Sequence, residues 1–189
     1  MSTNYKFFPN DEESLDFVLG VIGNEILLKS NWALNSFTEA IQAGDDETLC
    51  ASEIVRYVVN GLTHAMSIVR LITGVGAQSY EKERVQERVS VINNAWPNLP
   101  SPPEGLRDIR NNLEHFESRL DAWVTEASEK GHYKYIDLNV GMDRFENTEN
   151  VENLRNIDGD GNFNFWDDSV NINMVIEWMV EVEKEVRKE

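Results

Sequence analysis

Apolar residues recur every three or four positions through most of the chain, which is the spacing of amphipathic helices. This pattern predicts helices over residues 11–44, 45–73 and 80–96, with Asp11 or Ser14 capping the first. The second is apolar over a wide arc, so we expect it to lie at the centre of a bundle. Glycines follow the first two helices and prolines follow the third, which predicts where each helix ends.

A fourth helix is predicted to begin at Ser101-Pro102-Pro103-Glu104, which offers a serine cap, a proline in the first turn and a glutamate at the capping-box position. We expect it to continue without a break to Lys130-Gly131. Its apolar residues are spaced alternately by three and four and form one seam: Leu106, Ile109, Leu113, Phe116, Leu120 and Trp123.

After Gly131 the pattern changes to the alternation typical of strands. Residues 133–140 predict a strand, 162–165 and 170–172 predict a hairpin, and 174–186 predict a closing amphipathic helix with an exposed charged face.

These elements predict a mainly α protein: a four-to-five-helix bundle over residues 1–131, with a small C-terminal strand, hairpin and helix appendage over residues 132–189 packed on it. A chain of 189 residues, 41% of them hydrophobic, builds a sizeable core without cross-links. The single cysteine, Cys50, excludes an intramolecular disulfide and a cysteine-based metal cluster. We therefore expect a reducing, cytoplasmic setting.

Neither a signal peptide nor a membrane span is predicted. The first residues lack a basic start followed by an apolar run, and no later run reaches the roughly 18 apolar residues that a span needs. The sequence also has no glycine-rich phosphate loop, Walker lysine or nucleophile elbow, which argues against the large nucleotide-binding and hydrolase classes.

The net charge of −17 argues against generic binding to duplex nucleic acid or to membranes. The charge is unevenly distributed, however, because residues 51–130 hold nine of the 17 lysines and arginines against eleven acids. A local basic site in this middle segment is therefore compatible with the acidic whole.

The best candidate for such a site is the stretch from Arg110 to His115 on the predicted fourth helix. At 100° per residue, Arg110 lies about a quarter turn from the apolar seam and His115 lies on the far side. Together with Asn111 they form a second, polar face. Arginine can hold phosphate oxygens bidentately, and an imidazole can exchange a proton near neutral pH, so this group suits a phosphodiester.

The stretch from Leu106 to Trp123 resembles the HEPN superfamily of helical-bundle proteins, many of which are metal-independent endoribonucleases in toxin–antitoxin, phage-defence and RNA-processing systems. The family motif is an arginine, a polar residue and, after a short gap, a histidine on a late helix. Arg110 matches the arginine, Asn111 the polar residue and His115 the histidine, with four residues between Arg110 and His115.

The resemblance implies a homodimer that cleaves RNA without a cofactor or divalent metal and leaves a cyclic phosphate. By that resemblance, His115 activates the ribose 2′-hydroxyl or protonates the leaving oxygen. Arg110 holds the phosphate and stabilises its developing charge, and Asn111 orients one of them.

Two alternatives remain open at this stage. In the first, Arg110 pairs with Glu114 four residues on, and His115 lies on an ordinary solvated face. In the second, the chain is a non-catalytic HEPN-like interaction module that binds a cognate protein partner through its acidic surface.

Residues 156–163 fit the first half of a calcium loop, with oxygen-bearing side chains at alternate positions. The candidate ligands are Asp158, Asp160 and Asp167. A tight hairpin at one of the Asp-Gly pairs accounts for the same residues, because such pairs favour two-residue turns.

Overall fold

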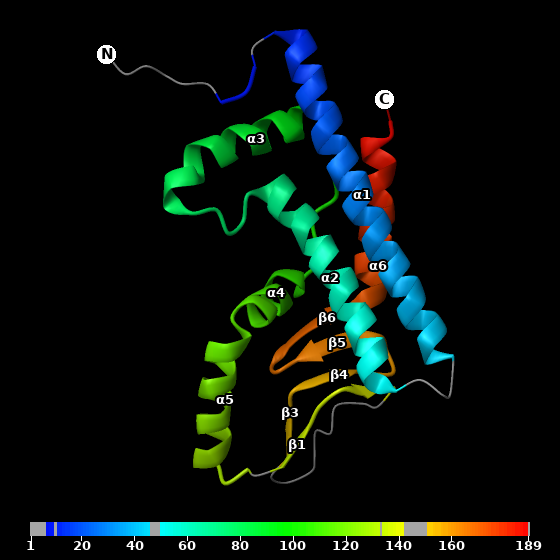
Figure 1. The fold of residues 1–189 in the computed structure, drawn as a ribbon, viewed down its shortest axis with the longest axis vertical. Helices are drawn as coiled ribbons and strands as arrows, with labels where there is room; N and C mark the ends of the chain where they lie inside the picture. Colours follow the sequence, from blue (N-terminus) through cyan, green and yellow to red (C-terminus); the bar gives the residue numbers. More distant parts are fainter. Residues whose placement is uncertain (1–6, 10, 46–49, 133, 142–150, 189) are drawn as a thin grey trace.

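The computed structural model describes residues 7–9, 11–45, 50–132, 134–141 and 151–188. The protein is mainly helical with a small sheet near its C-terminus (Figure 1). Helices α1 (Glu12–Gly44) and α2 (Ala51–Thr73) run antiparallel, and α6 (Ile172–Val186) packs beside both of them. The described part of the chain has no helix that is both long and apolar enough to span a membrane.

The ends of the first helices follow from local chemistry. Asp11 caps α1, since its side chain accepts a hydrogen bond from the Ser14 backbone N–H at 2.9 Å. Helix α2 begins at Ala51, later than predicted, and residues 46–49 lie outside the described ranges. Gly74 ends α2 in the left-handed conformation, as expected for a glycine after a helix.

Helix α2 contacts four other helices: α1, α3 (Lys82–Ala95), α4 (Leu106–Glu114) and α6. A short 3-10 turn, η1 (Ser79–Glu81), leads into α3.

The predicted fourth helix is wrong in two respects. It does not begin at residues 101–104, and it is two helices, α4 (Leu106–Glu114) and α5 (Phe116–Glu129), rather than one. Gly105 precedes α4 with a φ of 80°, and a Cβ atom there would lie 1.8 Å from the Ser169 carbonyl oxygen. This close approach fixes where α4 can begin, which the capping-box pattern could not reveal.

The predicted hairpin is confirmed as β5 (Asn162–Phe165) and β6 (Asp168–Asn171), which pair antiparallel. The predicted strand over 133–140 is two short strands, β1 (Lys134–Ile136) and β2 (Asn139–Val140), and Tyr133 lies outside the described residues. Sequence analysis missed β3 (Val151–Asn153) and β4 (Arg155–Ile157), which are too short to show a period. The four-stranded sheet has the order β2-β4-β5-β6, and β1 pairs with β3.

One hydrophobic core joins the helices to the sheet. Val175, Met179 and Val182 of α6 belong to the same buried cluster as Ile26 of α1 and Phe163 of β5. Residues on both sides of position 131 therefore share a core, and the division of the chain into a bundle and an appendage stays a prediction.

We expect Gly105→Ala to lower the free energy of unfolding by at least about 2 kcal/mol, because the new methyl group meets the Ser169 carbonyl and the left-handed backbone is strained for alanine. Urea denaturation measures this change. The control is Gly20→Ala on α1, where a Cβ atom has open space and alanine favours the helix. Equal stability of the two variants would contradict the proposed close contact.

Candidate functional site

The three predicted site residues lie where α4 ends and α5 begins. His115 separates the two helices with φ −113° and ψ 28°, outside helical values. Its backbone N–H donates to the Asn111 carbonyl at 3.0 Å, and its carbonyl accepts from the Arg119 N–H at 3.0 Å. His115 thus ends one helix and starts the next, and its side chain is exposed.

Aromatic packing directs α5 away from the line of α4. The Phe116 ring stacks on Trp166 at 5.9 Å between centroids and also meets Phe165 at 6.0 Å. The Arg155 guanidinium lies 5.5 Å from the Phe116 ring centre. Because the first residue of α5 is held by the β5–β6 turn, the chain changes direction at His115, and α5 extends beside the sheet (Figure 1).

Arg110 is buried, with 6% of its surface exposed. Its Nη2 atom pairs with Glu114 Oε2 at 2.5 Å, so the four-residue ion pair considered as an alternative forms. The other oxygen of Glu114 pairs with Arg70 from α2. Glu114 therefore bridges a buried arginine and a half-exposed one.

The loop after α2 covers the Arg110 guanidinium. A Cβ atom on Gly76 would lie 3.0 Å from Arg110 Nη2, so the backbone of this loop rests against the cation. Arg110 Nε has no hydrogen-bond acceptor among the described residues. In this arrangement a phosphate reaches the Arg110 guanidinium only if the loop or Glu114 moves.

The structure does not place the three predicted residues on one solvated face. Arg110 is buried, Asn111 is half-buried and His115 is exposed. Among the described residues, no hydrogen bond or ion pair joins the side chains of these three to one another. What links them is Glu114, which precedes His115 and holds Arg110.

Sequence analysis missed Asn112, a neighbour of Asn111 that is fully buried. Its Nδ2 atom donates to the Phe165 carbonyl and to Asp168 Oδ2, both at 3.0 Å, and its Oδ1 atom accepts from Arg119. The available signal was helical phase, because on a wheel drawn for the predicted single helix Asn112 falls at the border of the apolar seam. Asn112 joins α4 to the β5–β6 hairpin.

The calcium candidates do not come together. Asp158 and Asp160 lie in the turn before β5, whereas Asp167 lies in the turn after it. Asp158 instead accepts hydrogen bonds from the backbone N–H groups of Asp160 and Asn162 at 3.1 and 2.8 Å, and from the Asn162 side chain at 3.0 Å. Within the described residues, no group of three or more His, Cys, Asp or Glu side chains is placed to hold a metal ion.

Burial alone would raise the pKa of Asp158, but the hydrogen bonds from Asn162, Asn164 and Asp160 outweigh it and lower the pKa below its usual value. The carboxylate is therefore part of the hairpin turn, which is the simpler of the two interpretations of this segment.

No family model, curated protein or solved structure matches this chain. The resemblance to the HEPN superfamily accordingly stays a prediction that rests on Arg110, Asn111 and His115.

We expect Asn112→Ala to lower the free energy of unfolding by about 2 kcal/mol, because the buried Phe165 carbonyl and the partly exposed Asp168 carboxylate lose their hydrogen bonds to the amide. The control is Asn111→Ala, one position earlier on the same helix, where no side-chain hydrogen bond to a described residue is lost. Urea denaturation of both variants checks the difference. Similar losses at the two positions would contradict the structural role of Asn112.

We expect the stabilising effect of Asp158 to depend on pH. Its pKa is lowered by folding, so the ionised side chain stabilises the protein above the unfolded-state pKa of about 3.9, and this contribution is lost as the pH falls through the folded-state value. Asp158→Ala should cost about 1 kcal/mol or more at pH 7, and the difference from wild type should shrink toward pH 3. Urea titrations over this range measure it, with the exposed Asp160→Ala as control. A difference that does not vary with pH would count against the hydrogen-bonded carboxylate.

Proposed function

We propose that this chain is a HEPN-like protein that binds RNA as a homodimer and cleaves it without a metal ion, with His115 in the acid–base role. The observation that carries the proposal is the exposure of His115 at the junction of α4 and α5. Its side chain makes no hydrogen bond or ion pair with any described residue, so both ring nitrogens are open to a substrate. A titratable group that is reachable and unpaired in this way can exchange a proton with a ribose hydroxyl.

Charges next to His115 support the same proposal. Glu114, the preceding residue, holds Arg70, whose side chain is 48% exposed. Arg70 thus presents a cation to solvent, and a phosphodiester needs such a charge to balance its own.

Arg110 takes a different part in this proposal from the one that the family motif implies. It is a positioning residue that fixes Glu114, unless Glu114 releases it to the phosphate. Asn111 is half-buried and keeps its proposed role of orienting the phosphate or the imidazole.

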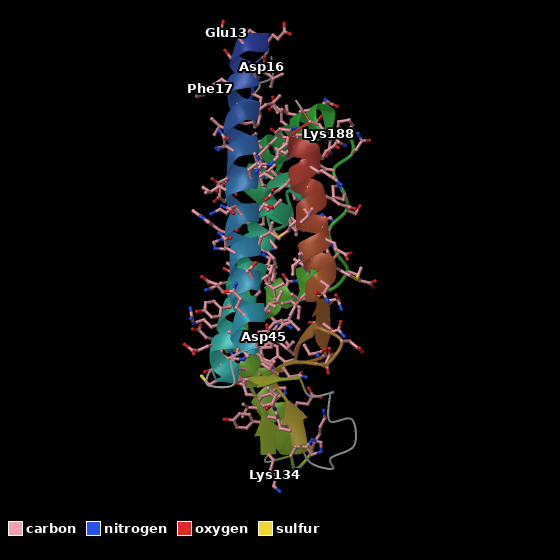
Figure 2. The ribbon with its side chains drawn as sticks, turned by 90° about the vertical axis from the view of Figure 1, so that its right-hand side faces the viewer. Glu13, Asp16, Phe17, Asp45, Lys134 and Lys188 are labelled. Carbon is pink, nitrogen blue, oxygen red and sulfur yellow. The ribbon has the colours of Figure 1, made fainter. Side chains whose placement is uncertain are left out.

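An apolar stripe on α1 supports the expectation of a second copy or another protein partner. Phe17, Val21, Leu28 and Trp32 are 41–73% exposed, and their spacing of four, seven and four places them on one helix face. Figure 2 shows Phe17 on the side of α1 away from α6. Exposed apolar faces of this kind mark interaction surfaces.

A non-catalytic interaction module is the second candidate function. It is favoured by the burial of Arg110, which a phosphate cannot reach in this conformation. The net charge of −17 suits a partner protein with a basic surface. In this version the α1 stripe and the surrounding acids form the contact face, and His115 has no chemical role.

The catalytic proposal is tested with single-stranded RNA in EDTA. We expect wild type to cleave it to products ending in a cyclic phosphate, and His115→Ala to slow cleavage about 100-fold or more, because general acid–base catalysis contributes this much. His132→Ala, beyond the end of α5, is the matched histidine control and should retain the wild-type rate.

Equal cleavage by wild type and His115→Ala would mean that His115 is not catalytic. A wild type with no activity on RNA, together with a stable protein complex that His115→Ala still forms, would replace the ribonuclease proposal with the interaction module.

A further inference from the structure

Three arginines line a pocket between α2 and α3. The pocket has a volume of about 270 Å³ and is lined by Arg70 near the end of α2, by Arg84 and Arg88 of α3, and by the backbone of the loop at Gly74 and Gly76. Figure 1 shows that α3 runs back past the C-terminal end of α2. None of these arginines belongs to the predicted motif.

A structural role accounts for Arg88. Its Nε atom donates to the Leu71 carbonyl and its Nη2 atom to the Arg70 carbonyl, both at 3.3 Å. These carbonyls belong to the last turn of α2, where cations are favoured, and the Arg70 carbonyl also accepts from the Gly74 backbone N–H at 3.0 Å. A guanidinium has five N–H donors, so Arg88 keeps donors for a second acceptor.

Arg84 has no such role. It lies one helical turn before Arg88, is exposed, and makes no ion pair or hydrogen bond with any described residue. Burial lowers the pKa of Arg88, and the positive charge of Arg84 lowers it further. The two cations therefore repel each other. Two such neighbouring cations stand out in a chain that has 34 acids against 17 bases.

The net charge of the residues that line the pocket is positive even when the carboxylate of Glu81 is included. Glu81 also lines it, and its charge partly offsets that of Arg88. Arg70 is the third cation, and its partner Glu114 lies outside the pocket lining. An anion that entered would meet three guanidinium groups and one carboxylate, and it would compete with Glu114 for Arg70.

We propose that this pocket binds a phosphate group with three free oxygens, either as a free small-molecule phosphate or as the terminal monoester of a larger ligand. Arginine forks match phosphate oxygens, and the pocket lies just below the roughly 300 to 1,000 Å³ of pockets that enclose whole small ligands. A pocket of this volume has room for a phosphate group. The proposal does not rest on ribonuclease activity.

The direct test is a titration of ¹⁵N-labelled protein with inorganic phosphate at constant ionic strength, with chloride as the reference anion. We expect the side-chain Nε–H signals of the pocket arginines to shift on adding phosphate. Arg84→Gln should weaken phosphate binding about tenfold or more, because a charge-assisted hydrogen bond is lost. Glu81→Gln should tighten it, because the opposing charge is removed.

The matched control is Arg107→Gln, which removes an exposed arginine of α4 outside the pocket and should leave the affinity for phosphate unchanged. No shift with phosphate, or an affinity lowered equally by Arg84→Gln and Arg107→Gln, would overturn the proposal.

Two oligoribonucleotides distinguish the sources of the phosphate, using His115→Ala protein to prevent cleavage. If the 5′-phosphorylated oligonucleotide binds more tightly than the 5′-hydroxyl one, and this preference disappears in the His115→Ala, Arg84→Gln double variant, the ligand is an RNA end. Equal binding of the two, with inorganic phosphate still bound, would identify a small phosphorylated ligand. None of these experiments measures RNA cleavage. A pocket that fails to bind phosphate therefore leaves the ribonuclease proposal standing, and a chain that fails to cleave RNA leaves the phosphate-binding proposal standing.

Discussion

The docking of α4 on the β5–β6 hairpin is the constraint on which the rest of the site depends. At the start of the helix, Gly105 lies so close to the Ser169 carbonyl that no side chain fits between them. Two turns later, Asn112 binds the same hairpin with its buried amide. A nine-residue helix held at both ends to one hairpin has a fixed position and rotation. The next residues pack on the aromatic turn at Trp166, so the direction of the chain must change at His115.

The same rotation places the charges. With Asn112 facing the hairpin, Arg110 faces α2 and the loop that follows it, where Gly76 rests on its guanidinium. A buried cation destabilises the fold unless a carboxylate compensates its charge. Removing one partner of a buried ion pair is therefore more destabilising than replacing both partners by apolar residues. Glu114 supplies the compensation and, through Arg70, ties α4 to α2. The electrostatics of the site are therefore a consequence of helix packing.

Patterns that act within one element were predictable from the sequence. The Asp11 cap, the stop at Gly74 and the β5–β6 hairpin depend on neighbours in the chain. The break at His115 was not predictable, because the three- and four-residue spacing of apolar positions continues across it. The spacing does not reveal that the residues before and after His115 pack against different parts of the protein. The ion pair of Arg110 with Glu114 was visible as a four-residue spacing, but its burial depends on a loop more than thirty residues away. Single-sequence periodicity reports which face is apolar, and it does not report what covers the other faces.

Net charge is a poor guide to such a site. At about 0.1 M salt, charges more than roughly 10 Å apart are largely screened, so acids spread over a long molecule do little to a cluster of cations at one place. On α3, burial lowers the pKa of Arg88, and the positive charge of Arg84 lowers it further, so these two cations are close enough to repel each other. Of the arginines that line the pocket between α2 and α3, Arg70 also pairs with Glu114 of α4, the helix whose position the hairpin fixes. The local charge and the volume of this pocket decide which ligand it binds. An acidic chain can accordingly hold a site for an anion.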